Sequence, residues 1–151
     1  MTEKSREFKG RVVMAGHLSG EAVVSHGGFN TLASFQKDMI LRKKIMKCSD
    51  QNNTDIFGKV LSGKILCLPK TIGSTTGGLV LQTVASVGAA PAALLFSEEI
   101  DSLAAAGVIL ADVWNGNRIV TIDNLGAEFL AYVQQGQKLD IFDDGRVIVH
   151  E

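Results

Sequence analysis

The chain has 151 residues, of which 46% are hydrophobic and 21% are charged, so it has the length of one domain (roughly 100–200 residues) and too little charge for a disordered chain. Fifteen Lys and Arg residues against 16 Asp and Glu residues give a formal net charge of −1, which argues against a globally basic nucleic-acid-binding protein. Sixteen glycines and only two prolines indicate tight turns, close backbone approaches or loops that wrap a ligand.

The first half of the chain predicts strands and loops. Residues 8–25 contain two β-branched segments separated by glycine and polar residues, which is typical of two strands with a turn between them. Gly27 and Gly28 interrupt this pattern. The pattern of residues 30–47 does not distinguish a strand from a helix. Residues 48–63 are rich enough in Asp, Asn, Ser and Gly to predict a long exposed loop.

The second half is more regular. Residues 64–69 form a short apolar run that ends at Pro69 and predicts a buried strand. A loop rich in glycine and hydroxyl groups follows at 70–78. The apolar spacing of residues 79–87 predicts a mostly buried helix that ends at Gly88.

A second strand and helix follow in the same order. Residues 92–96 predict another buried strand. Residues 97–107 predict a short helix with Ser97 as its N-cap and with Glu98 and Glu99 in its first turn.

The C-terminal third adds strands and one more helix. Residues 108–114 and 117–122 predict one or two strands. Residues 124–136 predict a helix capped by its final glycine, and residues 138–151 predict a hairpin around Asp144 and Gly145.

The alternation of strands and helices over residues 64–122 indicates βαβ units and a partly parallel sheet. The first half supplies further strands without clear helices. We therefore predict a single layered α/β domain over residues 1–151, with a second sheet.

Several classes of protein are excluded or disfavoured. No run of about 18 apolar residues predicts a membrane span, and the N-terminus has no secretory signal pattern. Two cysteines are too few for a disulfide scaffold and are expected to stay reduced, in a cytoplasmic protein. The histidines show no ligand spacing, so we expect no metal site on this chain. The two cysteines are Cys48 and Cys67, and the three histidines are His17, His26 and His150.

The loop Gly73-Ser74-Thr75-Thr76-Gly77-Gly78 is the strongest candidate for a functional site. It follows a predicted buried strand and precedes a predicted helix, where open α/β sheets bind their ligands and where free helix N–H groups accept anions. It lacks the P-loop pattern. The alternative is an ordinary helix N-cap with a flexible connecting loop.

Three other segments each have two interpretations. The polar loop 48–54 is a solvated connection or a recognition patch, and residues 26–31 form a turn or, if they face the 73–78 loop, part of a ligand site. The basic residues Lys37, Arg42, Lys43, Lys44 and Lys47 form a solvated face or an anion-steering surface. For Trp114, core packing is favoured over an interface.

The segment GKVLSGKILCLPKTIGSTTGGLVLQTVASVGAAPAALLF (58–96) resembles the aconitase X small subunit, or swivelling domain. That family shows G-K-x-L-x-G-K-[IV]-L, then a proline, a G-S-[ST] loop, a helix and an A-P-x-A-[IL] strand, and this chain has each of these in order. The similarity extends over about three quarters of the chain.

The resemblance implies a swivelling β/β/α three-layer domain, like the fourth domain of aconitase, that closes over a large subunit. It implies that the large subunit carries an iron–sulfur cluster. It also implies that Ser74 is the general base. The residues expected to contact a small hydroxy-acid substrate are Gly73, Thr75, Thr76, Asn30, Thr31 and Ser34.

Within the family, one branch dehydrates mevalonate 5-phosphate and another dehydrates cis-3-hydroxy-L-proline. The segments GFNTLASFQ and CSDQNN resemble the hydroxyproline branch. The mevalonate 5-phosphate branch usually has a G-G-[VI]-[DN]-P and an H-P-x-x-G pattern in these regions, and both are missing here. The resemblance therefore favours a hydroxyproline dehydratase small subunit. A mevalonate 5-phosphate dehydratase subunit and a non-catalytic anion-binding or regulatory module stay open.

Serine is a weak base, and this limits how Ser74 can act. If its hydroxyl is as weak an acid as bulk water, ionisation at neutral pH needs roughly 12 kcal/mol. A helix N-terminus supplies at most about 2 kcal/mol. Lys70 is the nearest cation in the sequence, but we expect the partner subunit to supply most of the remainder.

Overall fold

The computed structural model describes residues 4–73 and 75–151. Over these residues the chain forms the strands β1 (Ser5–Lys9), β2 (Arg11–Met14), β3 (Leu18–Val24), β4 (Phe29–Asn30), β5 (Ile65–Leu68), β6 (Thr71–Ile72), β7 (Ala93–Phe96), β8 (Val120–Asp123), β9 (Lys138–Ile141) and β10 (Arg146–His150). The helices are α1 (Thr31–Ile40), α2 (Gly77–Ser86), α3 (Ser102–Asn115) and α4 (Ala127–Tyr132).

Eight strands form one sheet in the order β1-β10-β9-β3-β5-β7-β8-β2. Strands β3, β5, β7 and β8 are parallel to one another, which confirms the predicted βαβ units. The remaining pairs of this sheet are antiparallel, and β9 and β10 form the predicted hairpin. The short strands β4 and β6 pair in parallel as a separate sheet.

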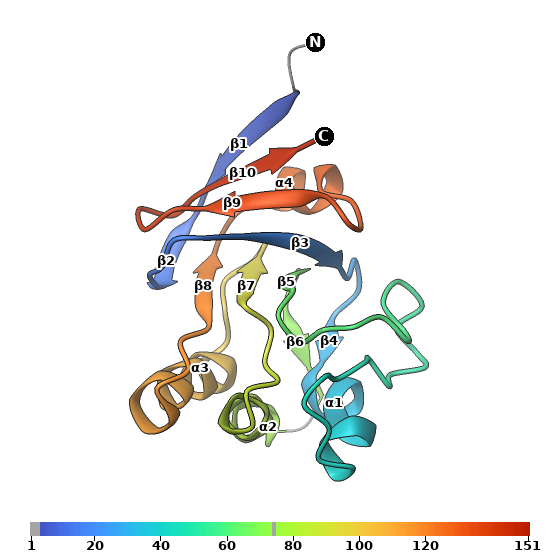
Figure 1. The fold of residues 1–151 in the computed structure, drawn as a ribbon. Coiled ribbons are helices and arrows are strands. Elements are labelled where there is room, and N and C mark those ends of the chain that lie inside the picture. Colours follow the sequence, from blue (N-terminus) through green and yellow to red (C-terminus); the bar gives the residue numbers. More distant parts are fainter. Residues whose placement is uncertain (1–3, 74) are drawn as a thin grey trace.

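The two ends of the sheet are brought together at Gly10. Strands β1 and β2 lie at opposite ends of the strand order but are separated in the chain by this one residue. The Gly10 N–H donates to the Gly145 carbonyl at 3.1 Å. The sheet therefore folds over on itself, and β3, β9 and β10 cross above the upper ends of β5, β7 and β8 (Figure 1).

Alternation along the strands separates two cores. In β5, Ile65 and Cys67 point into a core that the folded sheet and α4 enclose. Leu66 and Leu68 point to the other face, into a core shared with α1, α2 and α3. The result is the predicted β/β/α arrangement of three layers.

One predicted helix is wrong at both ends. Residues 97–107 are not a helix that begins at Ser97: α3 runs over 102–115, and its N-cap is Asp101, whose carboxylate accepts from the N–H groups of Leu103 and Ala104. Residues 108–114 are not a strand but the rest of this helix. Packing decides this, because Val108 and Ala111 are fully buried one turn apart.

The structure also resolves or adjusts other segments. Residues 30–47, for which the sequence did not distinguish a strand from a helix, contain α1. The helix predicted over 124–136 is limited to 127–132. Residues 48–63 are a long connection, but not simply an exposed one, because it buries several apolar side chains: Cys48, Ile56 and Leu61.

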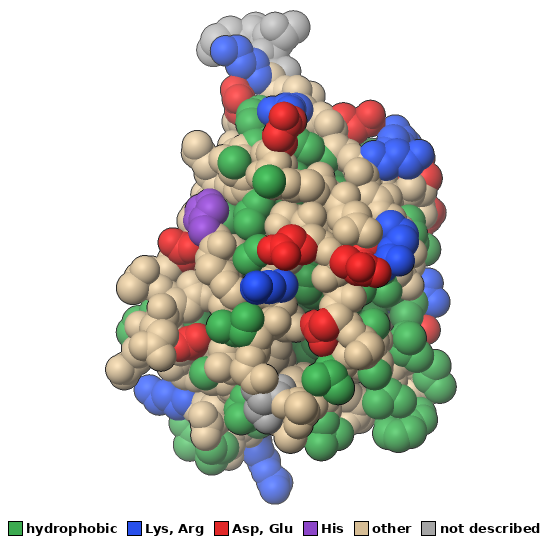
Figure 2. Space-filling model, turned by 180° about the vertical axis from the view of Figure 1, so that it is seen from behind, with side chains coloured by type: hydrophobic (Ala, Val, Ile, Leu, Met, Phe, Trp, Pro, Cys, Tyr) green, Lys and Arg blue, Asp and Glu red, His purple; other side chains and the backbone are tan. Residues whose placement is uncertain are grey.

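Trp114 is not part of the core, since 68% of it is exposed. It belongs to a group of exposed hydrophobic side chains on α3 with Leu103, Ile109 and Val113. Seen from behind, hydrophobic side chains gather at the lower right of the molecule, where α3 lies (Figure 2). No helix among the described residues is long and apolar enough to span a membrane.

Candidate functional site

The pairing of β4 with β6 brings two distant loops together. Phe29 lies opposite Thr71 and Asn30 opposite Ile72, and the Phe29 N–H donates to the Lys70 carbonyl at 2.9 Å. The 26–31 segment therefore lies beside the start of the glycine-rich loop.

Gly73 lies directly against Asn30. A Cβ atom on Gly73 would be 2.7 Å from Asn30 Nδ2, and its φ of 100° is itself unfavourable for other residues. Asn30 Oδ1 accepts from the Ala33 N–H at 3.0 Å and so caps α1. One side chain thus begins α1 and supports the glycine-rich loop, and this contact requires glycine at position 73.

The first turn of α2 is similarly close to its neighbours. A Cβ atom on Gly78 would overlap the carbonyl oxygen of Leu103 in α3. The corresponding position on Gly77 would be 3.7 Å from both Cβ and Oγ1 of Thr31. The N-terminus of α2 is therefore held between the first turns of α1 and α3.

A pocket of about 220 Å³ lies where these elements meet. The residues that line it are Thr31, Thr71, Ile72, Gly73, Gly77, Gly78, Asp101, Leu103 and Ala104. The Thr71 hydroxyl donates to Asp101 Oδ1, while Asp101 Oδ2 accepts two N–H groups of α3 at 3.0 Å each. Both carboxylate oxygens of Asp101 are therefore occupied.

A second pocket of about 310 Å³ lies on the other side of Ile72. Its lining contains two carboxylates, of Asp50 and Asp55, with Gly27, Gly28, Asn52, Asn53 and Thr54. No Lys or Arg is among the described residues that line either pocket. Ile72 thus lines both pockets: one where helices begin and where Asp101 is hydrogen-bonded, and one that contains the carboxylates of Asp50 and Asp55.

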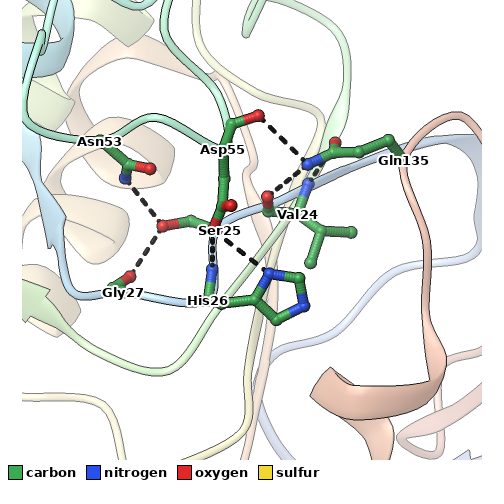
Figure 3. A network of polar contacts seen from close by, with 7 residues as sticks. All are labelled: Val24, Ser25, His26, Gly27, Asn53, Asp55 and Gln135. Carbon is green, nitrogen blue, oxygen red and sulfur yellow. Dashed lines mark hydrogen bonds and ion pairs between the residues drawn. The ribbon is translucent and has the colours of Figure 1, made fainter.

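A network of hydrogen bonds fixes the polar loop against the end of β3 (Figure 3). The buried Ser25 hydroxyl donates to the Gly27 carbonyl at 2.7 Å and accepts from Asn53 Nδ2 at 2.8 Å. The Asp55 carboxylate accepts from the His26 N–H at 2.8 Å. The polar loop is therefore an ordered wall of the second pocket, which the sequence alone left open.

Gln135 joins the same network from the segment after α4. It exchanges two hydrogen bonds with the backbone of Val24, at 2.8 and 2.6 Å, as Figure 3 shows. The side-chain amide of Gln135 thus bonds both the N–H and the carbonyl of Val24, as the backbone of a neighbouring strand would.

The structure brings only part of the predicted substrate-contacting set together. Thr31 and Gly73 line the 220 Å³ pocket, and Asn30 lies beneath Gly73. Thr75 and Thr76 are exposed and do not line it. Ser74 lies outside the described residues.

Ser34 is separated from that group. It is fully buried, its carbonyl accepts from the Ser49 N–H, and its hydroxyl makes no hydrogen bond to another described residue. The structure gives this side chain no place on the pocket surface.

Sequence reasoning missed Thr71 and Asp101 as pocket residues. A signal for Asp101 was present, since an aspartate directly before a helix is a strong N-cap. No local pattern indicates Thr71, because β6 has only two residues.

The cysteines do not suit a metal or an iron–sulfur cluster. Burial raises the pKa of both thiols, and the smaller effects of the Asp50 N–H and the Ser34 hydroxyl on Cys48 do not offset it. Metals and clusters bind the thiolate form. Among residues 4–73 and 75–151, no three His, Cys, Asp or Glu side chains are grouped as metal ligands, so these residues do not fit an iron–sulfur cluster.

Comparisons with known proteins show the family to which the chain is related. A family model described as the aconitase X swivel domain matches residues 7–150. The phosphomevalonate dehydratase small subunit of Pyrococcus furiosus is 31% identical over 107 residues, covering 71% of this chain and 74% of the relative. That of Thermococcus onnurineus is 27% identical, covering 96% and 99%.

Two solved structures share the fold. The crystal structure of Thermococcus kodakaraensis aconitase X in its holo-form superimposes with a TM-score of 0.80 at 28% identity, covering 97% of this chain and 99% of that one. The solution structure of a UPF0107 protein superimposes with a TM-score of 0.76 at 26% identity, covering 97% and 100%.

Proposed function

Because the chain belongs to the aconitase X swivel domain family, we propose that it is the small subunit of a hydro-lyase that dehydrates a small hydroxy acid. The observation that carries this proposal is the pocket beside the glycine-rich loop, where Gly73 and Gly77 approach Asn30 and Thr31. Relatives named as dehydratase small subunits share most of their length with this chain.

Ser74 is the proposed general base. Dehydration requires a group that removes the proton α to a carboxylate, and Ser74 follows Gly73, which lines the pocket. The N-terminus of α2 supplies at most about 2 kcal/mol of the roughly 12 kcal/mol that an alkoxide requires. Exclusion of water and cationic groups of a large subunit must supply the rest.

The remaining members of the site have supporting roles in this proposal. Thr75 and Thr76, both exposed, contact the substrate or orient Ser74. Asn30 supports the loop at Gly73. The proposal assigns the iron–sulfur cluster to the large subunit, as the resemblance to the family implies.

Mevalonate 5-phosphate is the first candidate substrate. The comparisons favour it over the hydroxyproline that the GFNTLASFQ and CSDQNN segments indicate, since the relatives described above are named phosphomevalonate dehydratase small subunits. Hydroxyproline is the second candidate. The observation in its favour is the pocket that contains Asp50 and Asp55 without a basic residue among its described lining, which suits the ammonium group of an imino acid.

The test is reconstitution with the large subunit encoded in the same genome. The purified pair is assayed with mevalonate 5-phosphate and with cis-3-hydroxy-L-proline. Loss of water from either substrate supports the hydro-lyase and identifies the substrate. Turnover of neither by an assembled, cluster-loaded pair contradicts the proposal and favours a non-catalytic anion-binding module.

The same preparation tests Ser74. Ser74→Ala is expected to abolish turnover without affecting assembly, whereas Ser86→Ala, on an exposed position at the end of α2, is expected to keep it. Activity of Ser74→Ala within a few fold of the unmodified pair contradicts the general-base role.

A further inference from the structure

Three helices begin around the 220 Å³ pocket. Thr31 is the first residue of α1, Gly77 and Gly78 open α2, and Leu103 and Ala104 lie in the first turn of α3. The first N–H groups of a helix have no carbonyl partner within that helix, and the aligned peptide dipoles place partial positive charge there. The helix N-termini therefore contribute partial positive charge at a pocket that has no basic side chain among its described lining residues.

Two of these N-termini are already occupied. Asn30 caps α1 through the Ala33 N–H, and Asp101 caps α3 through the Leu103 and Ala104 N–H groups. The charge of Asp101 is thus offset by α3 and by the Thr71 hydroxyl. The N-terminus of α2 lies between them. Gly77 and Gly78 place no side chain in the pocket that they line, although Gly78 is itself buried against α3.

Thr31 provides a separate sign of a ligand. It is only 2% exposed, it lines the pocket, and its Oγ1 faces Gly77, 3.7 Å from the Cβ position of that residue. Its hydroxyl donates to no other described residue. Because this hydroxyl lines the pocket and is not bonded to another described side chain, it is free to donate to a ligand that enters the pocket.

We propose that this pocket binds the carboxylate group of the substrate, held by the Thr31 hydroxyl and by first-turn N–H groups of α2. A carboxylate suits it better than a phosphate, because Asp101 lines the pocket and no Lys or Arg among the described lining residues balances a second negative charge. The identity of the ligand as substrate rests on the proposed function.

The assignment has a consequence for specificity. Mevalonate 5-phosphate and cis-3-hydroxy-L-proline share a carboxylate and the hydroxyl group β to it, and they differ elsewhere. This pocket therefore binds the carboxylate common to both, and the phosphate or the ring ammonium is bound by another surface.

The first test needs no turnover. The full ¹⁵N-labelled chain is titrated with propionate and, separately, with inorganic phosphate, while the amide signals of Gly77 and Gly78 are followed. Propionate is expected to give saturable shifts that Thr31→Val removes and Thr31→Ser keeps. The matched control is Ser34→Ala, which removes a buried hydroxyl of the same helix that has no place on the pocket surface.

Each other result overturns the proposal. No saturable shift with propionate, or a shift that Thr31→Val leaves unchanged, removes Thr31 from the site. If inorganic phosphate binds with a lower Kd than propionate, the pocket is assigned to the phosphate group instead.

The second test uses the reconstituted pair. Thr31→Val is expected to raise KM about tenfold, the effect of losing one hydrogen bond to a charged group, with kcat changed far less; Thr31→Ser restores KM. An unchanged KM overturns the role in substrate binding. If the unmodified pair dehydrates neither substrate, the proposed function fails, while the titration still decides whether the pocket binds a carboxylate.

Discussion

Gly78 in α2 and Gly107 in α3 contact each other backbone to backbone: a Cβ atom on Gly107 would lie 2.5 Å from the carbonyl oxygen of Gly78. A Cβ atom on Gly78 would overlap the Leu103 carbonyl oxygen. This close crossing is what places the first turn of α2 at the edge of the 220 Å³ pocket, next to Asp101.

Gly78→Ala and Gly107→Ala are therefore expected to destabilise the chain. In a free helix such a change stabilises by up to about 1 kcal/mol, but here the added methyl group forces the helices apart, which costs about 1–3 kcal/mol. Denaturant unfolding measures the difference. Gly27→Ala is the control, because no atom lies within 4 Å of its Cβ position; unchanged stability of both helix variants would show that the helices separate without cost.

The sequence predicts the middle of the fold well and the pocket poorly. Between residues 64 and 96 the strands β5 and β7 and the helix α2 have strong local patterns, and the structure confirms them. The pocket depends instead on two-residue strands: Thr31 reaches Gly77 only because β4 pairs with β6, and no periodicity shows in so short a segment.

The wrong start of α3 has a physical cause. Ser97 and Asp101 are both good N-cap residues. The backbone at Ser97 is already engaged, since its N–H donates to the Leu68 carbonyl and its carbonyl accepts from the Gly126 N–H. The helix therefore begins at the second cap, and this competition can be judged only from tertiary contacts.

Asp123 is expected to be the most sensitive polar residue of the sheet. Its side chain is fully buried and accepts from Arg11 Nε at 2.9 Å, from Arg11 Nη2 at 2.6 Å and from the Ile100 N–H at 2.9 Å. Asp123→Asn places an amide N–H against one of these donors, so the free energy of unfolding should fall by about 1–3 kcal/mol.

Denaturant titration of Asp123→Asn beside Glu99→Gln tests this. Glu99 also approaches Arg11, at 3.7 Å, but its side chain is 72% exposed, and its replacement should have little effect. Equal effects of the two variants would contradict the importance of burial.

The stability of the chain should depend on Asp140 at acidic pH. The Ser19 hydroxyl, and to a lesser extent His150, lower the pKa of this carboxyl group. The folded state therefore binds this proton less readily than the unfolded state, so the stabilisation is fully present above the ordinary pKa of about 3.9 and is lost as the pH falls below it.

Ser19→Ala is expected to lower the free energy of unfolding at pH 7 and to make its fall between pH 4 and pH 2 less steep. Urea unfolding across this range measures both effects. Ser102→Ala, on an exposed position of α3, should leave the slope unchanged. An identical acid slope for Ser19→Ala and the unmodified chain would exclude this contact as its cause.

Neither cysteine should react in the folded chain. Cys48 is 2% exposed and Cys67 is fully buried, and burial raises the pKa of both thiols, so the reactive thiolate is scarce. A disulfide reagent such as dithionitrobenzoate should label neither thiol before unfolding and both in guanidinium. Phe57→Cys, at a position that is 51% exposed, should add one rapidly labelled thiol. Rapid labelling of native Cys48 would contradict the effect of burial on its thiol.

The hydrogen bond from Thr71 to Asp101 is expected to position the glycine-rich loop. Thr71 lies in β6, two residues before Gly73, and its hydroxyl donates across the pocket to the N-cap of α3. Thr71→Val keeps the shape of the side chain but removes the donor, so we expect about a tenfold lower kcat/KM in the reconstituted pair, the equivalent of roughly 1.4 kcal/mol. Thr71→Ser keeps the hydroxyl and should restore activity, with assembly unchanged in both variants. If Thr71→Val leaves kcat/KM unchanged, or if Thr71→Ser reduces it as much as Thr71→Val does, the hydrogen bond is not what positions the loop.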